Sequence, residues 1–329
     1  MVTIKDIAKI AGVSPSTVSR SLNDYPNISQ KTKEKIKKIA EELGFEFNEA
    51  ARSLNKKKTN TIGVIIPQFF DDMRGEIFFA NFLGKLIKEA QVRGYHVRIE
   101  YEIEKKYIKK MIQSRSVDGL LLMNPEISKE DIEFILEKKF PYIFLHYLSE
   151  NYIDTNVNYV RTDQEKGGYI ATKYLIEKGS RKILTLSGLS INYEFIERTN
   201  GYKKAIEEYK IDKEYILDID VTFESAKKAI HKNKKLLKEI DAIFAQTDLM
   251  ALGVIEALNE LNIKIPEDIS IIGFDNIQIG TYFKPRLTTI EQPIGKLARI
   301  GIKKLIELME KNTNVKKFID PKLIIRESA

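Results

Sequence analysis

The chain of 329 residues contains no cysteine. Disulfides and thiol chemistry are therefore excluded, and this absence is consistent with the reducing cytoplasm. No apolar run reaches the roughly 18 residues that a membrane-spanning helix needs. The N-terminus also lacks the charged and then apolar segments of a signal peptide, so we expect a cytoplasmic protein with no membrane partner.

Sequence signals for enzymatic chemistry are absent too. The three histidines, His96, His146 and His231, lie far apart and do not have metal-ligand spacing. No Gly-x-x-x-x-Gly-Lys phosphate loop occurs, and Ser187-Gly188 lacks the residues that surround a nucleophilic serine. We expect no catalytic activity, no metal and no cofactor.

The residues that are present are typical of a globular protein larger than one domain, with 43% hydrophobic and 31% charged residues. The net charge of +7 is unevenly distributed. The first 58 residues hold 12 Lys or Arg against 7 Asp or Glu, so they carry +5 of it. A basic N-terminal region suits phosphate binding, although lysine-rich surfaces are usually just solvated.

Residues 3–23 predict two short helices joined by a tight turn. Thr3 is placed to cap the first helix, and Asp6 three positions later completes a capping box. Ser14 is a second N-cap. It is followed by Pro15 at the first helical position, where a missing N–H has no cost.

The apolar residues of these two helices recur on one face at helical spacing. They are Ile4, Ile7, Ala8, Ala11, Val18 and Leu22. Ser16, Thr17 and Arg20 point outward from the second helix. This layout is typical of a helix-turn-helix, whose second helix enters the major groove of DNA.

The rest of the chain divides into three predicted segments. A third helix, from the N-cap Ser29 to Gly44, completes an all-helical headpiece over residues 1–46. Residues 47–60 predict one or two helical turns and a basic linker, too short to be stable without a partner. Residues 61–329 predict an α/β core, because apolar runs alternate there with amphipathic stretches.

The core predicts two lobes built on parallel sheets, because it contains two successive series of βα units. We expect buried strands at 62–67, 97–101, 119–123, 142–145, 182–186, 215–219, 242–245 and 269–273. We expect helices near 77–92, 104–115, 129–138, 164–178, 194–209, 223–236 and 248–261. A helix near 293–311 and a strand near 322–326 imply that the chain crosses between the lobes more than once. The N-lobe is expected at about 61–160 and 291–319, and the C-lobe at about 161–290 and 320–329.

This sequence resembles the LacI/GalR family of bacterial transcription regulators over essentially its whole length. The similar segments are Thr3–Asn23, Asn48–Leu54, Thr61–Pro67 and Phe244–Gln292. The last of them contains Thr247–Gly253, Ile272-Gly273-Phe274-Asp275-Asn276 and Leu287–Ile290. The resemblance implies a helix-turn-helix headpiece, a hinge helix that folds on operator DNA, and a two-lobed core like the periplasmic sugar-binding proteins.

The resemblance also implies a set of DNA contacts. The positions that match the family's base readers are Pro15, Ser16 and Arg20. Arg20 can donate two hydrogen bonds to a guanine, and the alternative is an ordinary solvated arginine. Residues better placed for phosphates are Thr3, Thr17, Asn23 and Asn27.

In the hinge, Leu54 matches the family's leucine that wedges into the minor groove at the operator centre. The alternative for Leu54 is an apolar residue that covers a domain junction. Ala50 and Ala51 are small, as close packing of two hinge helices requires.

The resemblance further implies a small-molecule effector in the cleft between the lobes. Arg198 matches the arginine of the family's Arg-x-x-Gly, and its guanidinium can donate two hydrogen bonds to two oxygens of a sugar or a carboxylate. Asp275 matches the acidic residue that accepts from effector hydroxyls. Thr247 stands where several relatives have asparagine, and Phe223 where a family member has a tryptophan that stacks on its ligand.

Other positions are weaker candidates for the opposite wall of this cleft, with plain packing as an equal alternative. They are Phe69, Phe70, Asn124 and His146. Asp248 is expected to be a helix N-cap instead. Residues 68–84 depart from the family's commoner Asn-Pro-Phe-Phe pattern, so the effector's identity cannot be copied from one relative.

Together these implications predict a repressor of a carbohydrate-utilisation operon. It would bind a palindromic operator as a homodimer, be nucleoid-associated while bound, and be released allosterically by a small sugar or sugar phosphate. The dimer is expected because the chain ends at Ala329 without a leucine-heptad tail. Alternatives within the family are a corepressor-dependent regulator and a global catabolite regulator with a phosphorylated protein partner. Outside it, the alternatives are a sugar-binding transport module and a sugar-modifying enzyme on the same fold.

Overall fold

The structure is a computed structural model, and it divides into two units, Met1–Asn60 and Thr61–Ala329. The residues that it describes are 2–45, 58–67, 76–101, 107–124, 126–148, 152, 155–188, 193–311 and 314–329. Within these ranges, no helix combines the length and the apolar character needed to cross a membrane.

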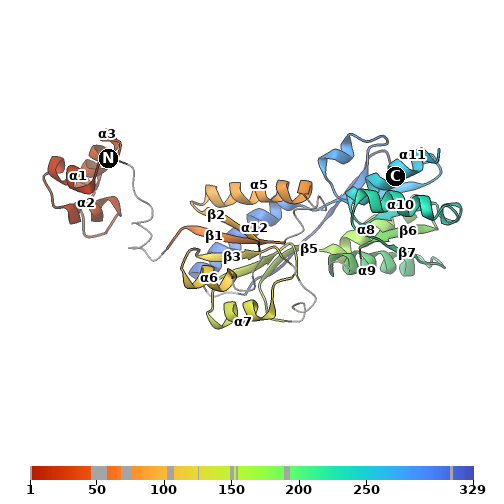
Figure 1. Ribbon diagram of the computed structural model, residues 1–329, viewed down its shortest axis with the longest axis horizontal. Helices are drawn as coiled ribbons and strands as arrows, with labels where there is room; N and C mark the ends of the chain where they lie inside the picture. Colours follow the sequence, from red (N-terminus) through yellow and green to blue (C-terminus); the bar gives the residue numbers. More distant parts are fainter. Residues whose placement is uncertain are drawn as a thin grey trace. The chain divides into compact units, whose positions relative to one another are not determined.

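The first unit is a three-helix domain around a small apolar core (Figure 1). Its helices are α1 (Ile4–Ala11), α2 (Pro15–Leu22) and α3 (Gln30–Glu42). Ile7, Val18 and Ile36 are fully buried in this core, one from each helix. The turn between α1 and α2 forms as predicted, because Gly12 adopts a φ of 70° and the Ser14 hydroxyl accepts from the backbone N–H of Thr17.

The second unit contains two six-stranded sheets. The first has the order β11-β5-β4-β3-β1-β2, formed by β1 (Thr61–Ile66), β2 (His96–Tyr101), β3 (Gly119–Leu122), β4 (Tyr142–Leu145), β5 (Tyr159–Thr162) and β11 (Lys316–Ile319). The second has the order β12-β10-β9-β8-β6-β7, formed by β6 (Ile183–Ser187), β7 (Tyr215–Asp218), β8 (Ala242–Ala245), β9 (Ser270–Asp275), β10 (Thr288–Glu291) and β12 (Lys322–Ile324). The described pairings are parallel, apart from the antiparallel pair β10–β12.

Helices cover both faces of each sheet, which explains why the central strands are apolar throughout (Figure 1). In the first lobe, α5 (Glu76–Val92) and α12 (Ile294–Glu310) pack on one face, and α6 (Tyr107–Gln113) and α7 (Lys129–Glu137) on the other. In the second lobe, α8 (Gln164–Glu177) and α9 (Tyr193–Glu208) lie opposite α10 (Phe223–Lys232) and α11 (Asp248–Glu260). Successive strand residues such as Ile243 and Phe244 therefore enter different cores.

The chain passes between the sheets three times: after β5, between β10 and α12, and between β11 and β12. β5 runs to Thr162, so the expected lobe boundary at 160/161 falls inside this strand. The sequence did not predict β5, β10 or β11. The helix expected at 223–236 ends earlier, at Lys232, because Asn233 caps it and a short 3-10 turn at Leu236–Lys238 follows.

Candidate functional site

The exposed face of α2 presents hydroxyls and one guanidinium. The Ser14 hydroxyl lies 2.9 Å from the hydroxyls of both Ser16 and Thr17. Ser16 is exposed, and Arg20 is exposed one turn further along the helix. This face can therefore offer hydrogen-bond donors from the first two turns of α2, which is the part of a recognition helix that meets base edges.

The four residues predicted for phosphates differ in how they are engaged. The backbone N–H and the hydroxyl of Thr3 both donate to the Asp6 carboxylate, at 2.8 and 2.7 Å, and these bonds hold the pKa of Asp6 below its usual range. The Asn23 amide donates to the Ser19 carbonyl oxygen at 2.8 Å and caps the end of α2. Asn27 is exposed. The donor groups of Thr3 and Asn23 are thus already hydrogen-bonded within the headpiece, to Asp6 and to Ser19.

In the second unit, Arg198 is buried, and hydrogen bonds from its guanidinium fix the side chain in place. The side chain is buried on α9, its Nε donates to Gln164 Oε1 at 2.9 Å, and its Nη1 donates to the Gln246 carbonyl oxygen. The Arg-x-x-Gly motif has a structural reason, because a Cβ at Gly201 would lie 2.0 Å from the Glu165 carbonyl oxygen. Glycine lets α9 approach α8 closely, and this approach brings Arg198 to Gln164.

Two glutamines connect Arg198 to Asp275. Gln164 Nε2 donates to Gln292 Oε1 at 3.1 Å, and Gln292 Nε2 donates to Asp275 Oδ1 at 2.8 Å. Burial raises the pKa of Asp275 to about 6, although the charge of Arg198 and the bond from Gln292 counteract it. Asp275 also has a φ of 118°, a strained backbone conformation of the kind that clusters at binding sites.

Beside Arg198 lies a buried carboxylate that the sequence reasoning missed. Glu194 is only 1% exposed, and neither of its oxygens has a hydrogen-bond partner among the described residues. Burial raises its pKa, and the charges of Arg161 and Arg198 counteract that effect. The spacing of four residues between Glu194 and Arg198 could have revealed it, since residues so spaced share a helix face.

An ion pair joins the two lobes next to this carboxylate. The buried Arg161 on β5 of the first sheet pairs with Glu197 on α9 of the second lobe. Burial lowers the pKa of Arg161, and the charge of Glu194 opposes this shift. The sequence showed no sign of it, because the β5 segment was not predicted as a strand.

His146 follows β4 and is enclosed by aromatic rings. The rings of Phe78, Phe79, Phe82 and Tyr147 lie between 4.4 and 5.9 Å from its own. Burial, with the charges of Arg198 and Arg161, lowers the pKa of His146 to about 3, so the ring is neutral at pH 7. The described ring contacts of His146 are thus aromatic, and the two arginines act on it through their charge.

Comparison with known proteins identifies the family. Residues 3–48 match the family model "Bacterial regulatory proteins, lacI family", and residues 172–329 match the "Periplasmic binding protein-like domain". The HTH-type transcriptional repressor PurR of Vibrio atlanticus (strain LGP32) is 33% identical over 338 residues, which cover 100% of this chain and 98% of the relative. The chain belongs to the lacI family. It is a DNA-binding transcriptional repressor, and its relatives are repressors rather than enzymes.

Solved structures of this family resemble the repressor over its whole length. A lac repressor dimer bound to operator and the anti-inducer ONPF superposes with a TM-score of 0.81 at 25% identity, covering 99% of this chain and 98% of that one. A complex of the transcriptional regulator CelR with cellobiose gives a TM-score of 0.73 at 26% identity and covers both chains completely. The predicted architecture, a helical headpiece and a two-lobed periplasmic-binding-protein-like core, is confirmed.

One prediction for this repressor is wrong: Asp248 is not the N-cap of α11. Thr247 is, because its hydroxyl accepts from the Met250 backbone N–H at 3.2 Å. The buried Asp248 is the first helical residue and accepts from the Ile277 backbone N–H at 2.8 Å and from the Thr289 hydroxyl. The helix thus begins one residue earlier than the motif suggested. The Thr247 hydroxyl, which was predicted to contact the effector, already accepts a hydrogen bond from the backbone of α11.

The described contacts of the remaining predicted effector residues are with the backbone or with apolar neighbours. Asn124 is buried, and its Oδ1 accepts from the Glu126 backbone N–H at 3.0 Å. Phe223 begins α10 and packs against the apolar core of that helix and α11. Among the predicted residues, the described hydrogen bonds connect Arg198 to Asp275 through the two glutamines. Thr247 directly follows Gln246, whose carbonyl oxygen accepts from Arg198. Phe69, Phe70, Ala50, Ala51 and Leu54 lie outside the described residues.

Proposed function

We propose that this repressor binds a palindromic operator as a homodimer and that a small neutral sugar, bound between the lobes beside Arg198 and Asp275, releases it. The observation that carries the effector proposal is the buried hydrogen-bond chain from Arg198 through Gln164 and Gln292 to Asp275. The similar solved structures support the rest, since their descriptions name a dimer on operator and a cellobiose complex.

We call Arg198, Gln164, Gln292 and Asp275 the effector cluster. Sugar hydroxyls match the chemistry of this cluster because each hydroxyl both donates and accepts. Arg198 supplies several N–H donors in a fixed fork, of which Gln164 and Gln246 use two. Gln292 occupies one carboxylate oxygen of Asp275. We assign the other oxygen to an effector hydroxyl. Neighbouring hydroxyls of one ring would then bridge the guanidinium and the carboxylate.

The charges around Arg198 favour a neutral effector over a sugar phosphate. Four carboxylates lie on the elements around this cluster, against three guanidiniums. The carboxylates are those of Glu194, Glu197, Asp248 and Asp275, and the guanidiniums are those of Arg161, Arg198 and Arg326. The buried Glu194 lacks a hydrogen-bond partner among the described residues and would repel a phosphate. A sugar hydroxyl would instead donate to it.

For the DNA side, we propose the domain division given by the sequence: a headpiece at 1–46, a hinge at 47–60 and the core at 61–329. Arg20 would read a base from α2, with Pro15 and Ser16 beside it. Thr3, Thr17, Asn23 and Asn27 would contact phosphates, and Leu54 and Ala51 would pack at the operator centre.

The Arg161–Glu197 pair supports a route for allosteric release. It joins the first sheet to α9, the helix that also carries Arg198 and Glu194. A ligand that shifts Arg198 would also shift α9, and would therefore change the geometry of the Arg161–Glu197 ion pair between the lobes. The two sites would then be coupled through the relative position of the lobes.

The test needs an operator and a set of sugars. DNA fragments selected in vitro from a random pool would be labelled, and the complex would be titrated with neutral mono- and disaccharides and with their 6-phosphates. Release by a neutral sugar supports the proposal. Tighter binding would favour the corepressor alternative, and release by the phosphates alone would contradict the neutral effector. Sedimentation of the free and bound protein checks the dimer.

A further inference from the structure

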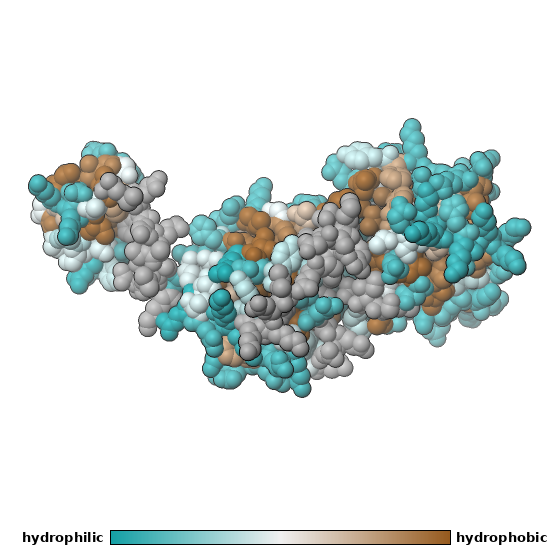
Figure 2. Space-filling model, in the orientation of Figure 1, coloured by the Kyte–Doolittle hydropathy of each residue, from teal (hydrophilic) through white to brown (hydrophobic). Residues whose placement is uncertain are grey.

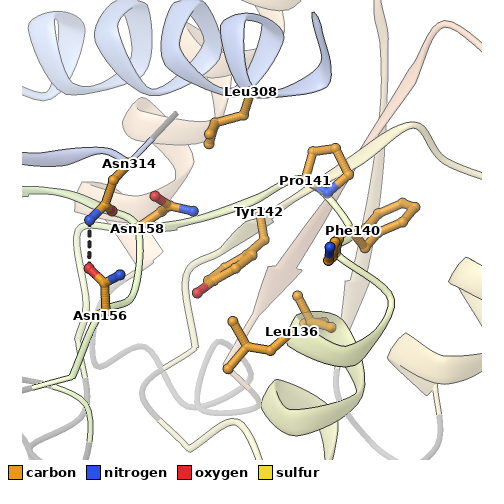
Figure 3. A pocket seen from close by; sticks show the side chains of 10 residues that line it. Leu136, Phe140, Pro141, Tyr142, Asn156, Asn158, Leu308 and Asn314 are labelled. Carbon is orange, nitrogen blue, oxygen red and sulfur yellow. Dashed lines mark hydrogen bonds between the residues drawn. The ribbon is translucent and has the colours of Figure 1, made fainter. Parts of the chain in front are cut away.

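A pocket lies in the first lobe, at the opposite end of β4 from His146. Tyr142 begins β4 and His146 follows its last residue, so the two lie at opposite ends of this strand. The pocket has a volume of about 300 Å³, which is the lower end of the range for small-molecule sites. Its walls come from the end of α7, the start of β4, the segment before β5 and the end of α12 (Figure 3).

A buried hydroxyl faces this pocket without an acceptor for its proton. Tyr142 is only 4% exposed, and no acceptor for its O–H is found among the described residues. Burial raises the pKa of this hydroxyl, and the backbone N–H of Asn158 counteracts that shift. Figure 3 shows the phenol ring in the pocket, with its oxygen directed toward the space between Asn156 and Leu136. A buried O–H left unpaired is unfavourable, and a ligand that supplied an acceptor would relieve this.

Most of the other polar groups of the pocket are donors. Asn158 Oδ1 accepts from the Val315 backbone N–H at 2.8 Å, which fixes the amide and leaves its NH₂ as the remaining group. Asn156 Oδ1 accepts from the Asn314 side-chain amide, which leaves the Asn156 NH₂ as a donor and the Asn314 Oδ1 as an acceptor (Figure 3). The lining also includes Lys139 and, among the described residues, no carboxylate. The site thus offers two amide donors and one positively charged residue against a single side-chain amide oxygen.

The rest of the lining is apolar. Leu136, Phe140, Pro141 and Leu308 surround the Tyr142 ring (Figure 3). We propose that this pocket binds a small carboxylate with an apolar body, such as an aromatic acid. Its carboxylate would accept from the Tyr142 hydroxyl and the asparagine amides near Lys139, and its ring would lie against the apolar wall.

Benzoate is a suitable probe, titrated by calorimetry into the full-length repressor. We expect saturable binding at one site per chain. Tyr142→Phe removes only the hydroxyl and should weaken binding about five- to tenfold, and Lys139→Gln should do the same by removing the charge. The matched controls should bind as the parent does. They are Tyr174→Phe, which removes a tyrosine hydroxyl of the second lobe that donates to the Ala329 carbonyl oxygen, and Lys138→Gln, the lysine next to Lys139 that pairs with Glu137.

Several outcomes would overturn the proposal. One is the absence of saturable benzoate binding, and another is equal binding of the cation benzylamine, which would refute the donor-rich chemistry. Arg198→Lys separates this pocket from the effector cluster. If Arg198→Lys abolishes benzoate binding while Tyr142→Phe leaves it unchanged, the ligand occupies the effector site instead.

Discussion

The guanidinium carbon of Arg198 lies 3.9 Å from the centre of the Phe274 ring, and Phe274 directly precedes Asp275 at the end of β9. Cation–π contact with a buried ring orients the guanidinium plane. The end of β9 thereby supplies two groups to the effector cluster: the Phe274 ring, which contacts the Arg198 guanidinium, and the Asp275 carboxylate. This relationship explains why an arginine on α9 and an aspartate some 77 positions later in the chain form one site.

Arg198→Lys should separate effector binding from DNA binding. Lysine keeps the charge but cannot stack on Phe274 or bond to Gln164 and Gln246 in one plane. We expect operator affinity within about twofold of the parent and effector affinity at least about tenfold lower. Fluorescence anisotropy of labelled operator during a sugar titration measures both. Arg181→Lys, at an exposed arginine of the same lobe, is the control. A normal sugar response of Arg198→Lys would remove Arg198 from the site.

Gly201→Ala should destabilise the second lobe. Its Cβ would lie 2.0 Å from the Glu165 carbonyl oxygen and 2.6 Å from the Tyr169 backbone nitrogen, so α9 must move away from α8. We expect a loss of about 1–3 kcal/mol in the free energy of unfolding and weaker effector binding. Gly84→Ala in α5 is the matched control, because no atom lies within 4 Å of its Cβ. That change should stabilise by up to about 1 kcal/mol. Equal urea midpoints for the two variants would contradict the close-approach argument.

Asp275 should make both stability and effector binding depend on pH. Burial raises its pKa from 3.8 to about 6, so the folded chain holds this proton more tightly than the unfolded chain. The stabilising contribution of the group is therefore present below about pH 4 and is lost as the pH rises to about 6. Asp275→Asn should remove this component, so its free energy of unfolding should fall less between pH 4 and 7 than that of the parent.

Effector binding should show the opposite dependence, because the ionised carboxylate is the acceptor. Affinity of the parent is expected to rise with pH through about 6, and that of Asp275→Asn to be low throughout. Unfolding and sugar titrations at a series of pH values test both statements. Asp212→Asn, at an exposed aspartate of the same lobe, should follow the parent. A parent-like profile for Asp275→Asn would exclude this carboxylate as the titrating group.

The sequence predicted the fold wherever burial is uniform. β3, β4 and β8 are covered by helices on both faces, so each appears as a continuous apolar run. β5, β10 and β11 escaped prediction because their residues, such as Arg161, Thr289 and Lys317, are polar or charged. Their polar side chains reach partners that only the folded chain supplies, as Arg161 reaches Glu197.

The candidate site was predictable only where a motif marked it. Arg198 and Asp275 stand in segments that resemble the family, and the structure connects them. The glutamines that connect them have no local signal, because Gln164 and Gln292 are 128 positions apart and meet only when the second lobe forms. Glu194 was missed although its spacing from Arg198 is visible in the sequence. The absence of a hydrogen-bond partner, which makes it informative, is a property of the packed structure.

Arg20→Ala should relax sequence discrimination on DNA. An arginine that donates to a guanine contributes about 1–3 kcal/mol, so we expect the selected operator to bind about 5- to 150-fold more weakly. Binding to unrelated DNA should fall much less, since Arg20 is one charge among many. Lys9→Ala, at an exposed lysine of α1, should weaken both kinds of DNA by a similar small factor. Filter or anisotropy binding at fixed salt measures the ratio, and an unchanged ratio would argue that Arg20 is merely solvated.

Leu54→Ala should weaken binding to the selected operator far more than binding to unrelated DNA. The side chain lies outside the described residues, so this prediction depends on the family resemblance of the hinge. An apolar wedge opens a base step and bends the duplex, and alanine is too short to fill the step. Energy transfer between dyes at the two ends of the operator should therefore report a smaller bend with the variant. Ser53→Ala, its neighbour in the same segment, should bend the operator as the parent does. Equal losses on both kinds of DNA, with an unchanged bend, would show that Leu54 covers a domain junction instead.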